Sequence, residues 1–474
     1  MTQAAPAARP LAMPTALAFS TIALPLGALA VAVAVYLPPH FSAHLGVPLS
    51  IVGLAFATVR MLDLGVDPVL GLVMDRTRTR LGRYRVWILI GGPILMAAVY
   101  ALFQAKAGIG AAYLIVWLLV FYLGNSILSL GHSAWAATLA TEYHQRSRMF
   151  GILAAAGVVG AVILLVIPIA TAHMGMHAAE GVRAQGWFIF AIIPLVIGLA
   201  CLATPERVTP APPEHFALRD YLSLITKPDL LRLFLAQMAL TLGPGWMSAL
   251  YMFFFTDSRG YSPEQASILL LVYVMAGIVG APFTARMAMR FSKHRTLMVT
   301  TTAYSLGLCT VMILPKASMG WGMLMMFWEG FMAAGFDLMI RAMLADVADE
   351  VRLEQGQERL SLIYALNALA YKIAAAFAIG LTFPLLDAVG YVAKDGAVNT
   401  LQAIHGLELA YIVGPIVFVM LGGACVLGWK LDAAKHADIR RQLEERDAHY
   451  AEAPVIESFG AEPAIAVPPE GRSG

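Results

Sequence analysis

The chain has 474 residues, of which 59% are hydrophobic and 13% are charged, and its formal net charge is +2. Soluble domains carry about 25% charged residues, so this composition excludes an ordinary soluble protein and indicates a membrane protein. The net charge gives no reason to expect a nucleic-acid partner, and three isolated cysteines lack the paired spacing of a metal site or disulfide framework.

Stretches of about 20 apolar residues, the length that crosses a bilayer as a helix, occur repeatedly along the chain. The first is longer than the core of a signal peptide, which has about 7–15 residues, so we expect it to remain as a membrane span. The twelve predicted spans are residues 12–37, 48–74, 86–104, 110–140, 150–172, 186–203, 231–255, 264–288, 295–315, 319–345, 361–386 and 405–430.

A proline-rich, charged segment at residues 204–230 divides the chain into two parts. Six spans on each side of a linker are typical of two-halved secondary transporters, which bind substrate between the halves near the bilayer midplane. We therefore predict an all-α integral membrane protein with twelve transmembrane helices, divided into halves at residues 1–203 and 231–430. Residues 431–474 are expected to form a tail that begins as a charged helix and ends in a segment of disordered composition.

Lysine and arginine gather in alternate loops, and this distribution sets the expected orientation. Five arginines lie in the loop that follows the second span, and basic residues recur in every second loop after it, whereas the intervening loops carry at most one each. Cytoplasmic loops carry this excess of positive charge, so we expect both termini in the cytoplasm and the protein in the cell inner (plasma) membrane.

The second span carries three charged residues, Arg60, Asp63 and Asp67, at spacings that place them on one helix face. A charge at the centre of a span costs about 2.5–3.5 kcal/mol, so these side chains must face protein or water. A structural Arg–Asp clamp is the alternative to a functional site. One arginine does not neutralise two carboxylates, and this favours the functional interpretation.

The loop after the second span is a candidate cytoplasmic gate. Asp75 ends the span, where a carboxylate is unfavourable at the negative end of the helix unless cations lie nearby. Arg76, Arg83 and Arg85 are suited to supply this charge and to tie the second and third spans together while the inner side is closed. The alternative is that the arginines only set the orientation.

The tenth and eleventh spans supply the remaining charges. Lys372 is the only charged residue of span 361–386, and it lies as far from the cytoplasmic end of its span as Asp63 does from Asp75. At about 1.5 Å per residue, both side chains lie about 18 Å deep. We therefore predict one buried cluster of Asp63, Asp67 and Lys372 between the halves, in which H⁺ or Na⁺ and the lysine alternate as partners of the carboxylates.

Three further charges lie in span 319–345. Asp337 and Arg341 are four residues apart and are expected to pair along the helix, either as a packing contact or with a role in substrate binding or gating. Glu329 is a candidate second proton site.

Glycine and proline mark the expected close helix contacts and bends. The motif G-V-V-G at residues 157–160 and the motif A-G-I-V-G at residues 276–280 allow neighbouring helices to approach closely. The motif G-P-G-W at residues 243–246 is expected to bend the seventh span or to line a cavity.

Two motifs resemble one transporter family. The pattern D-P-x-x-G-x-x-x-D-R-T-x-x-x-x-G-R-x-R-x-W runs from Asp67 to Trp87, and a second match covers residues 345–372. Both resemble the glycoside–pentoside–hexuronide:cation symporters of the major facilitator superfamily. The resemblance implies a major facilitator fold, sugar transport with Na⁺, Li⁺ or H⁺ by alternating access, a cation site at Asp63 and Asp67, and the family's lysine at Lys372.

The fourth span departs from the melibiose-type members of that family. Gly131 stands where they carry an acidic sugar-binding residue, and the first span has no charge at all. Trp135 does fit the family's aromatic position. We expect a substrate cavity lined by Asn125, His132, Trp135, Asp337, Arg341, Tyr364 and Asn367.

The chain has no phosphate-binding loop and no nucleophile–base constellation, so we expect a transporter and not an enzyme, with no cofactor beyond the coupling ion. The leading hypothesis is a monomeric symporter that carries a small polar solute, such as a glycoside or a sugar acid, together with H⁺ or Na⁺. The alternatives are a carrier of amphiphiles such as lysolipids, as some animal relatives are, and a membrane scaffold that transports nothing.

Overall fold

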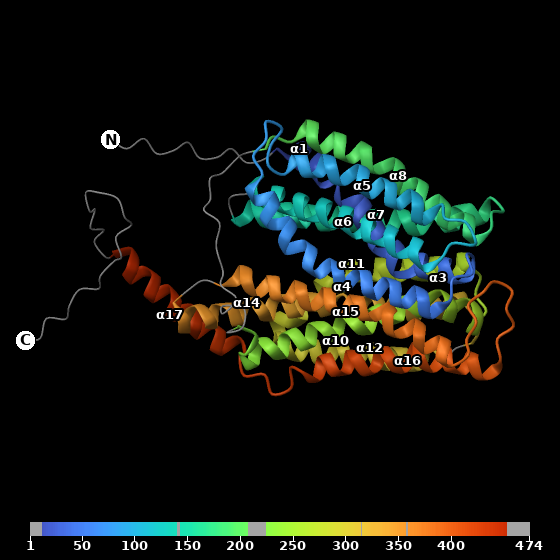
Figure 1. Cartoon of the computed structure of the whole chain (residues 1–474). Helices are drawn as coiled ribbons and strands as arrows, with labels where there is room; N and C mark the ends of the chain where they lie inside the picture. Colours follow the sequence, from blue (N-terminus) through green and yellow to red (C-terminus); the bar gives the residue numbers. More distant parts are fainter. Residues whose placement is uncertain (1–11, 140–142, 207–223, 314, 357–358, 453–474) are drawn as a thin grey trace, which may run out of the picture.

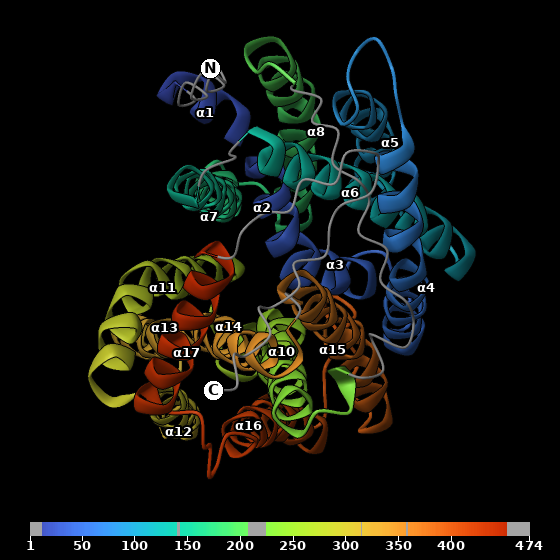
Figure 2. The ribbon, with the colours of Figure 1, turned by 90° about the vertical axis from the view of Figure 1, so that its left-hand side faces the viewer.

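The computed structural model describes residues 12–139, 143–206, 224–313, 315–356 and 359–452, and over these residues the chain is helical without β-strands. Two groups of helices lie side by side (Figures 1 and 2). The first group contains α1 (Met13–Ser20), α2 (Ala23–Val31), the π-helical turn η1 (Ala32–Tyr36), α3 (Leu37–Ala43), α4 (Leu49–Arg76), α5 (Arg85–Phe103), α6 (Ala111–Leu139), α7 (Tyr143–His173) and α8 (Ala178–Ala203).

The second group follows the linker, of which residues 207–223 lie outside the described part of the chain. It contains α10 (Pro228–Phe253), the π-helical turn η2 (Phe254–Ser258), α11 (Pro263–Phe291), α12 (Lys293–Thr310), α13 (Met319–Ala333), α14 (Gly335–Gln355), α15 (Leu360–Ala388), α16 (Leu401–Ala424) and the tail helix α17 (Ala433–Glu452). The predicted disordered end of the tail, residues 453–474, also lies outside the described residues.

The first span is interrupted because of its prolines. Helix α1 ends at Ser20 and α2 begins at Ala23, and Pro25 stands just inside α2. The proline has no N–H to donate, and its ring crowds the carbonyl of Thr21 four residues earlier, which breaks a continuous helix. The break lets α1 bend away from the axis of α2, as Figure 2 shows.

Eleven segments of the described chain are long and apolar enough to cross a membrane. The one predicted span without a match among them is the ninth, residues 295–315, which corresponds to α12. This helix is less apolar because it begins with three basic or titratable residues and contains several threonines. The hydroxyls of Thr296, Thr300, Thr301 and Thr302 donate to carbonyls of the preceding turn. Their hydrogen-bonding capacity is thus satisfied within the helix, which lets α12 pack in the bundle against α13 and α16.

The glycine motifs bring helix backbones into direct contact, as predicted. A Cβ atom added at Gly160 in α7 would lie 1.9 Å from the carbonyl oxygen of Leu24 in α2, and one at Gly280 in α11 would lie 2.2 Å from that of Phe331 in α13. Contacts this short leave no room for any other residue.

Replacing Gly160 by alanine should therefore destabilise the protein by about 1–3 kcal/mol, the usual cost of overpacking a close contact. Gly198→Ala in α8 is the matched control, because a Cβ atom at that position has no described neighbour within 4 Å beyond its own helix backbone. Thermal unfolding of the two purified variants tests this prediction. An equal unfolding temperature for both would contradict the close α2–α7 contact.

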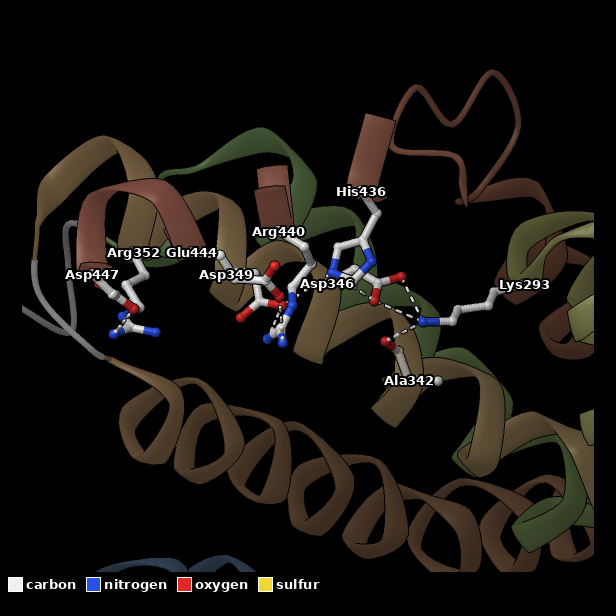
Figure 3. Close-up of polar contacts among 9 residues, drawn as sticks. All are labelled: Lys293, Ala342, Asp346, Asp349, Arg352, His436, Arg440, Glu444 and Asp447. Atoms are coloured by element: carbon white, nitrogen blue, oxygen red, sulfur yellow. Dashed lines mark hydrogen bonds and ion pairs between the residues drawn. The ribbon is translucent and has the colours of Figure 1, made fainter. Parts of the chain in front are cut away.

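Helix α17 is held against α14 by a row of ion pairs (Figure 3). Lys293, at the start of α12, contacts both carboxylate oxygens of Asp346 at 2.7 Å, and His436 of α17 lies between Asp346 and Asp349. The row continues to Arg352 and Asp447, which are 3.0 Å apart. The charged face of the tail therefore fastens it to the end of the tenth span.

Candidate functional site

Three predicted charges meet where α4 and α15 pack together. The ammonium nitrogen of Lys372 lies 2.9 Å from Oδ2 of Asp63 and also contacts Oδ2 of Asp67. Asp63 is 4% exposed, and the hydroxyl of Ser126 in α6 donates to its other oxygen at 3.1 Å. Helices α4, α6 and α15 thus contribute to one buried cluster, which we call the charge cluster: Asp63, Asp67, Lys372 and Ser126.

The charge cluster carries one negative charge more than its direct contacts neutralise. Oδ1 of Asp67 is buried and has no hydrogen-bond partner among the described residues. Buried carboxylate oxygens are normally paired, since an unpaired one loses its hydration without compensation. This oxygen is therefore a ready ligand for a proton or for a small hard cation such as Na⁺.

Arg60 does not form the clamp that was the alternative interpretation of these residues. Its guanidinium group lies over the ring of Tyr122, 4.8 Å from the centroid, and no ion pair in the described part of the chain joins it to Asp63 or Asp67. Arg60 acts on both carboxylates electrostatically from a greater distance. Lys372 is the cation that contacts both.

A cavity of about 600 Å³ lies beside the charge cluster, between the two groups of helices. Asn125 and Asp337 are among its lining residues, and the G-P-G-W motif contributes Pro244 and Gly245 to its wall. The polar and charged residues that line the cavity are Arg60, Tyr122, Asn125, Gln237, Thr241, Ser248, Tyr273, Asp337, Tyr371 and Lys372.

Two predicted cavity residues of α6, His132 and Trp135, lie outside this cavity. Both are buried against Phe19 of α1: Nε2 of His132 lies 3.0 Å from the Phe19 carbonyl oxygen, and the indole of Trp135 meets the Phe19 ring edge-on at 5.1 Å. His132 follows Asn125 by two turns of the helix and therefore shares its face. At that level, however, the face is covered by α1, which bends away from α2 at the proline break.

The other three predicted cavity residues, Arg341, Tyr364 and Asn367, are engaged in contacts of their own. The amide of Asn367 donates to Gln237 at 3.3 Å, and Tyr364 donates to the carbonyl of Arg341 at 3.2 Å. Nε of Arg341 lies 2.6 Å from Oδ2 of Asp337, so the charge of Arg341 is balanced by a residue that lines the cavity. None of the three is among the residues that line the cavity.

Six polar lining residues were missed by the sequence reasoning: Tyr122, Gln237, Thr241, Ser248, Tyr273 and Tyr371. Gln237 is the only amide side chain in its span, which was a usable signal. Tyr371 precedes Lys372 in the second family-like motif. Tyr122 lies one turn before Ser126 on α6, and no feature of the sequence distinguishes it from the other aromatic residues of that helix.

The predicted gate arginines hold the loop between α4 and α5 against the end of α8. The carboxylate of Glu206 accepts hydrogen bonds from the backbone N–H groups of Arg83, Tyr84 and Arg85 at 2.6–3.2 Å. The Arg85 guanidinium donates to the carbonyl of Thr204 at 2.6 Å, and the Arg83 side chain donates to the Met74 carbonyl at 3.4 Å. Arg76 is at the last position of α4, and the side chain of Asp75 lies outside the described part.

At the other end of the bundle, far from these arginines, the two groups of helices are joined directly. The hydroxyl of Tyr36 in η1 donates to Ser267 of α11 at 2.9 Å, and His173 of α7 pairs with Glu264 at 3.0 Å. His44 pairs with Asp395. Helices α4 and α15 converge toward this end in Figure 1, where a Cβ atom at Gly380 would be 2.5 Å from Cβ of Ala57.

Comparison with known proteins finds sugar transport proteins. A family model described as MFS/sugar transport protein matches residues 18–433. The lactose permease of Lactobacillus delbrueckii subsp. bulgaricus is 26% identical over 435 residues, which cover 85% of this chain and 67% of the permease. The isoprimeverose transporter of Lactiplantibacillus pentosus is 24% identical over 442 residues, which cover 88% of this chain and 89% of the transporter.

A further relative and a solved structure complete the comparison. The chain spans 64% of the raffinose carrier protein of Pediococcus pentosaceus, at 22% identity. The crystal structure of the nucleoside transporter NupG superposes with a TM-score of 0.65 at 12% identity, covering 88% of this chain and all of NupG. At that identity the superposition concerns the fold alone.

Proposed function

Because the chain belongs to the MFS/sugar transport protein family, a multi-pass membrane family of the major facilitator superfamily, we propose that it is a secondary transporter of a sugar, glycoside or sugar acid. The predicted all-α fold and the family resemblance are both confirmed by the family match. The single observation that carries the proposed mechanism is the charge cluster, which joins a carboxylate pair in one half to a lysine in the other.

The coupling ion is proposed to bind between Asp63 and Asp67. Two neighbouring carboxylates repel each other, and either Lys372 or a bound H⁺ or Na⁺ relieves that repulsion. When the ion binds, Lys372 is released from at least one carboxylate, which loosens the contact between α4 and α15. Ion binding thus shifts the balance between two arrangements of the halves, as alternating access requires.

The conformation is proposed to be one with the cavity open to the cytoplasm. The pairs Tyr36–Ser267 and His173–Glu264 join the halves at the end opposite the arginine loop, which favours closure there. The positive-inside rule assigns the arginine loop to the cytoplasm, together with both termini, in the cell inner membrane. Arg76, Arg83, Arg85 and Asp75 remain the proposed gate for the opposite conformation.

A polar solute fits the cavity better than an amphiphile does. Ten of its 25 lining residues are polar or charged, and hydroxyl and amide groups from both halves converge there. Arg60 lies in the wall and has no direct carboxylate partner among the described residues, so it is suited to hold the carboxylate of a sugar acid. The substrate and one monovalent cation are the proposed partners of a monomer.

Uptake into proteoliposomes tests the proposal. We expect lactose, raffinose, isoprimeverose or glucuronate to accumulate above its equilibrium level when an inward Na⁺ or H⁺ gradient is applied, and not when the gradient is collapsed. Protein-free liposomes are the control. Transport of lysophosphatidylcholine and of none of the sugars would support the amphiphile alternative, and no uptake of any solute would support a scaffold.

A further inference from the structure

A second buried carboxyl group, Glu329 of α13, lies apart from the charge cluster. Its side chain is 0% exposed, and neither of its oxygens has a hydrogen-bond partner in the described part of the chain. Glu329 also takes part in no ion pair among the described residues, whereas Asp63 and Asp67 both contact Lys372. The group is therefore chemically isolated in this conformation.

The surroundings of Glu329 are shaped to hold a carboxyl group. A Cβ atom at Gly307 of α12 would lie 2.2 Å from Oε1 of Glu329, so only glycine at that position leaves room for the carboxyl oxygen. The titratable groups that face it are tyrosines from three packed helices, Tyr273 of α11, Tyr304 of α12 and Tyr411 of α16. On α14, the remaining neighbour of α13, Asp337 and Arg341 pair with each other.

These contacts require the carboxyl group to carry its proton. An ionised carboxylate taken out of water costs several kcal/mol unless a cation or several donors compensate it. The neighbouring hydroxyls do not donate to it: Tyr304 contacts the sulfur of Met247 at 3.2 Å, and the buried hydroxyl of Tyr411 has no partner among the described residues. The neutral acid is the form that this environment tolerates.

The side chain of Tyr273 connects the central cavity to the surroundings of Glu329. Tyr273 lines the cavity and interacts electrostatically with Glu329. The two helices touch at this level, because a Cβ atom at Gly330 would lie 2.0 Å from the Tyr273 carbonyl oxygen. Ala333, which follows Glu329 by one turn on the same helix face, also lines the cavity.

We propose that Glu329 is a second proton-binding site, which holds a proton in this conformation and exchanges it with water in the central cavity past Tyr273. On release, the O–H bond of the carboxyl group breaks and the proton passes to a cavity water. Release requires the carboxylate to become hydrated, so it accompanies a rearrangement of α13 against α11 and α12. The exchange rests on the proposed alternating access, whereas the binding of the proton does not.

Infrared spectroscopy of the purified protein in lipid nanodiscs tests the proton directly. At neutral pH we expect a carbonyl stretching band of a protonated carboxylic acid, which Glu329→Gln removes. Asp337→Asn is the matched control and should keep the band. Gly307→Ala should keep the band and shift its frequency, because the added methyl group displaces Oε1; this variant serves if Glu329→Gln does not fold. A spectrum without the band, or a band unchanged by Glu329→Gln or Gly307→Ala, would overturn the proposal.

Transport of lactose separates this inference from the proposed function. In proteoliposomes we expect the pH dependence of lactose exchange to be weakened in Glu329→Gln, which keeps the site at Asp63 and Asp67, and exchange to be slowed in Tyr273→Phe. If the carbonyl band is observed but no sugar is transported, the proton site is supported and the proposed function is contradicted. Sugar transport without the band would contradict the proton site alone.

Discussion

Replacing Asp63 by asparagine should abolish gradient-driven accumulation of sugar and reduce uptake to passive equilibration. In the wild-type protein, one ammonium group faces two carboxylates, and the negative charge left over attracts the coupling ion. The substitution would leave a single carboxylate, that of Asp67, to pair with Lys372, so the contacts would already be balanced and the ion would gain little by binding. Sugar-for-sugar exchange should continue, because it needs no net movement of the ion.

Asp67→Asn is a second test of the same prediction, and Ser126→Ala is its control. Asp67→Asn removes the same charge and should uncouple transport in the same way. Ser126→Ala removes only a hydrogen bond to Asp63 and should keep accumulation, with a loss of stability of about 1 kcal/mol. Uptake should be measured in proteoliposomes with and without an inward Na⁺ or H⁺ gradient. Full gradient-dependent accumulation by both asparagine variants would show that the ion binds elsewhere.

The charge cluster was predictable because it depends on regular geometry. The rise of a helix is constant, so equal residue counts from the cytoplasmic end place Asp63 and Lys372 at equal depth before any packing is known. Charges in an apolar span must also find partners, which restricts the possible pairings. These two arguments use only the sequence, and the structure brings the three side chains together.

The cavity wall was less predictable because it depends on how helices are rotated and where they bend. His132 shares a helix face with Asn125, yet the bend in the first span at Pro25 places Phe19 over it. Asn367 lies one residue before Ala368, which lines the cavity, and it turns toward Gln237 on α10 instead. Such differences of a single helical position are decided by tertiary packing, for which the sequence alone provides no measure.

The contacts that join the two halves at the end opposite the arginine loop were also not predictable from the sequence. His44 and Asp395 lie in different halves and in loops, where no helical periodicity relates one residue to another. The same holds for Glu206, which binds the backbone of the arginine loop from the end of α8. In both cases a single carboxylate finds its partner through the folded arrangement of distant segments.

Replacing Lys372 by methionine should strongly destabilise the protein. The substitution leaves two carboxylates on adjacent turns of α4 without the cation that contacts both, and Asp63 is almost fully buried. Removing one partner of a buried ion pair costs about 3–5 kcal/mol. Lys316→Met is the control, because that lysine is exposed in a loop and its replacement should change the free energy of unfolding by less than about 0.5 kcal/mol.

The loss of stability in Lys372→Met should be reversible by the proposed coupling ions. Acid protonates the carboxylates, and Na⁺ neutralises them, so thermal unfolding of this variant should shift upward at lower pH or with added Na⁺ by more than in the wild type. A ligand at 100 times its dissociation constant stabilises by about 2.7 kcal/mol, which is large enough to detect. The double variant Asp63→Asn/Lys372→Met has a single carboxylate left and should recover most of the lost stability. If neither ion nor the second substitution restored it, Lys372 would act through packing, and the charge of the cluster would have no part in ion binding.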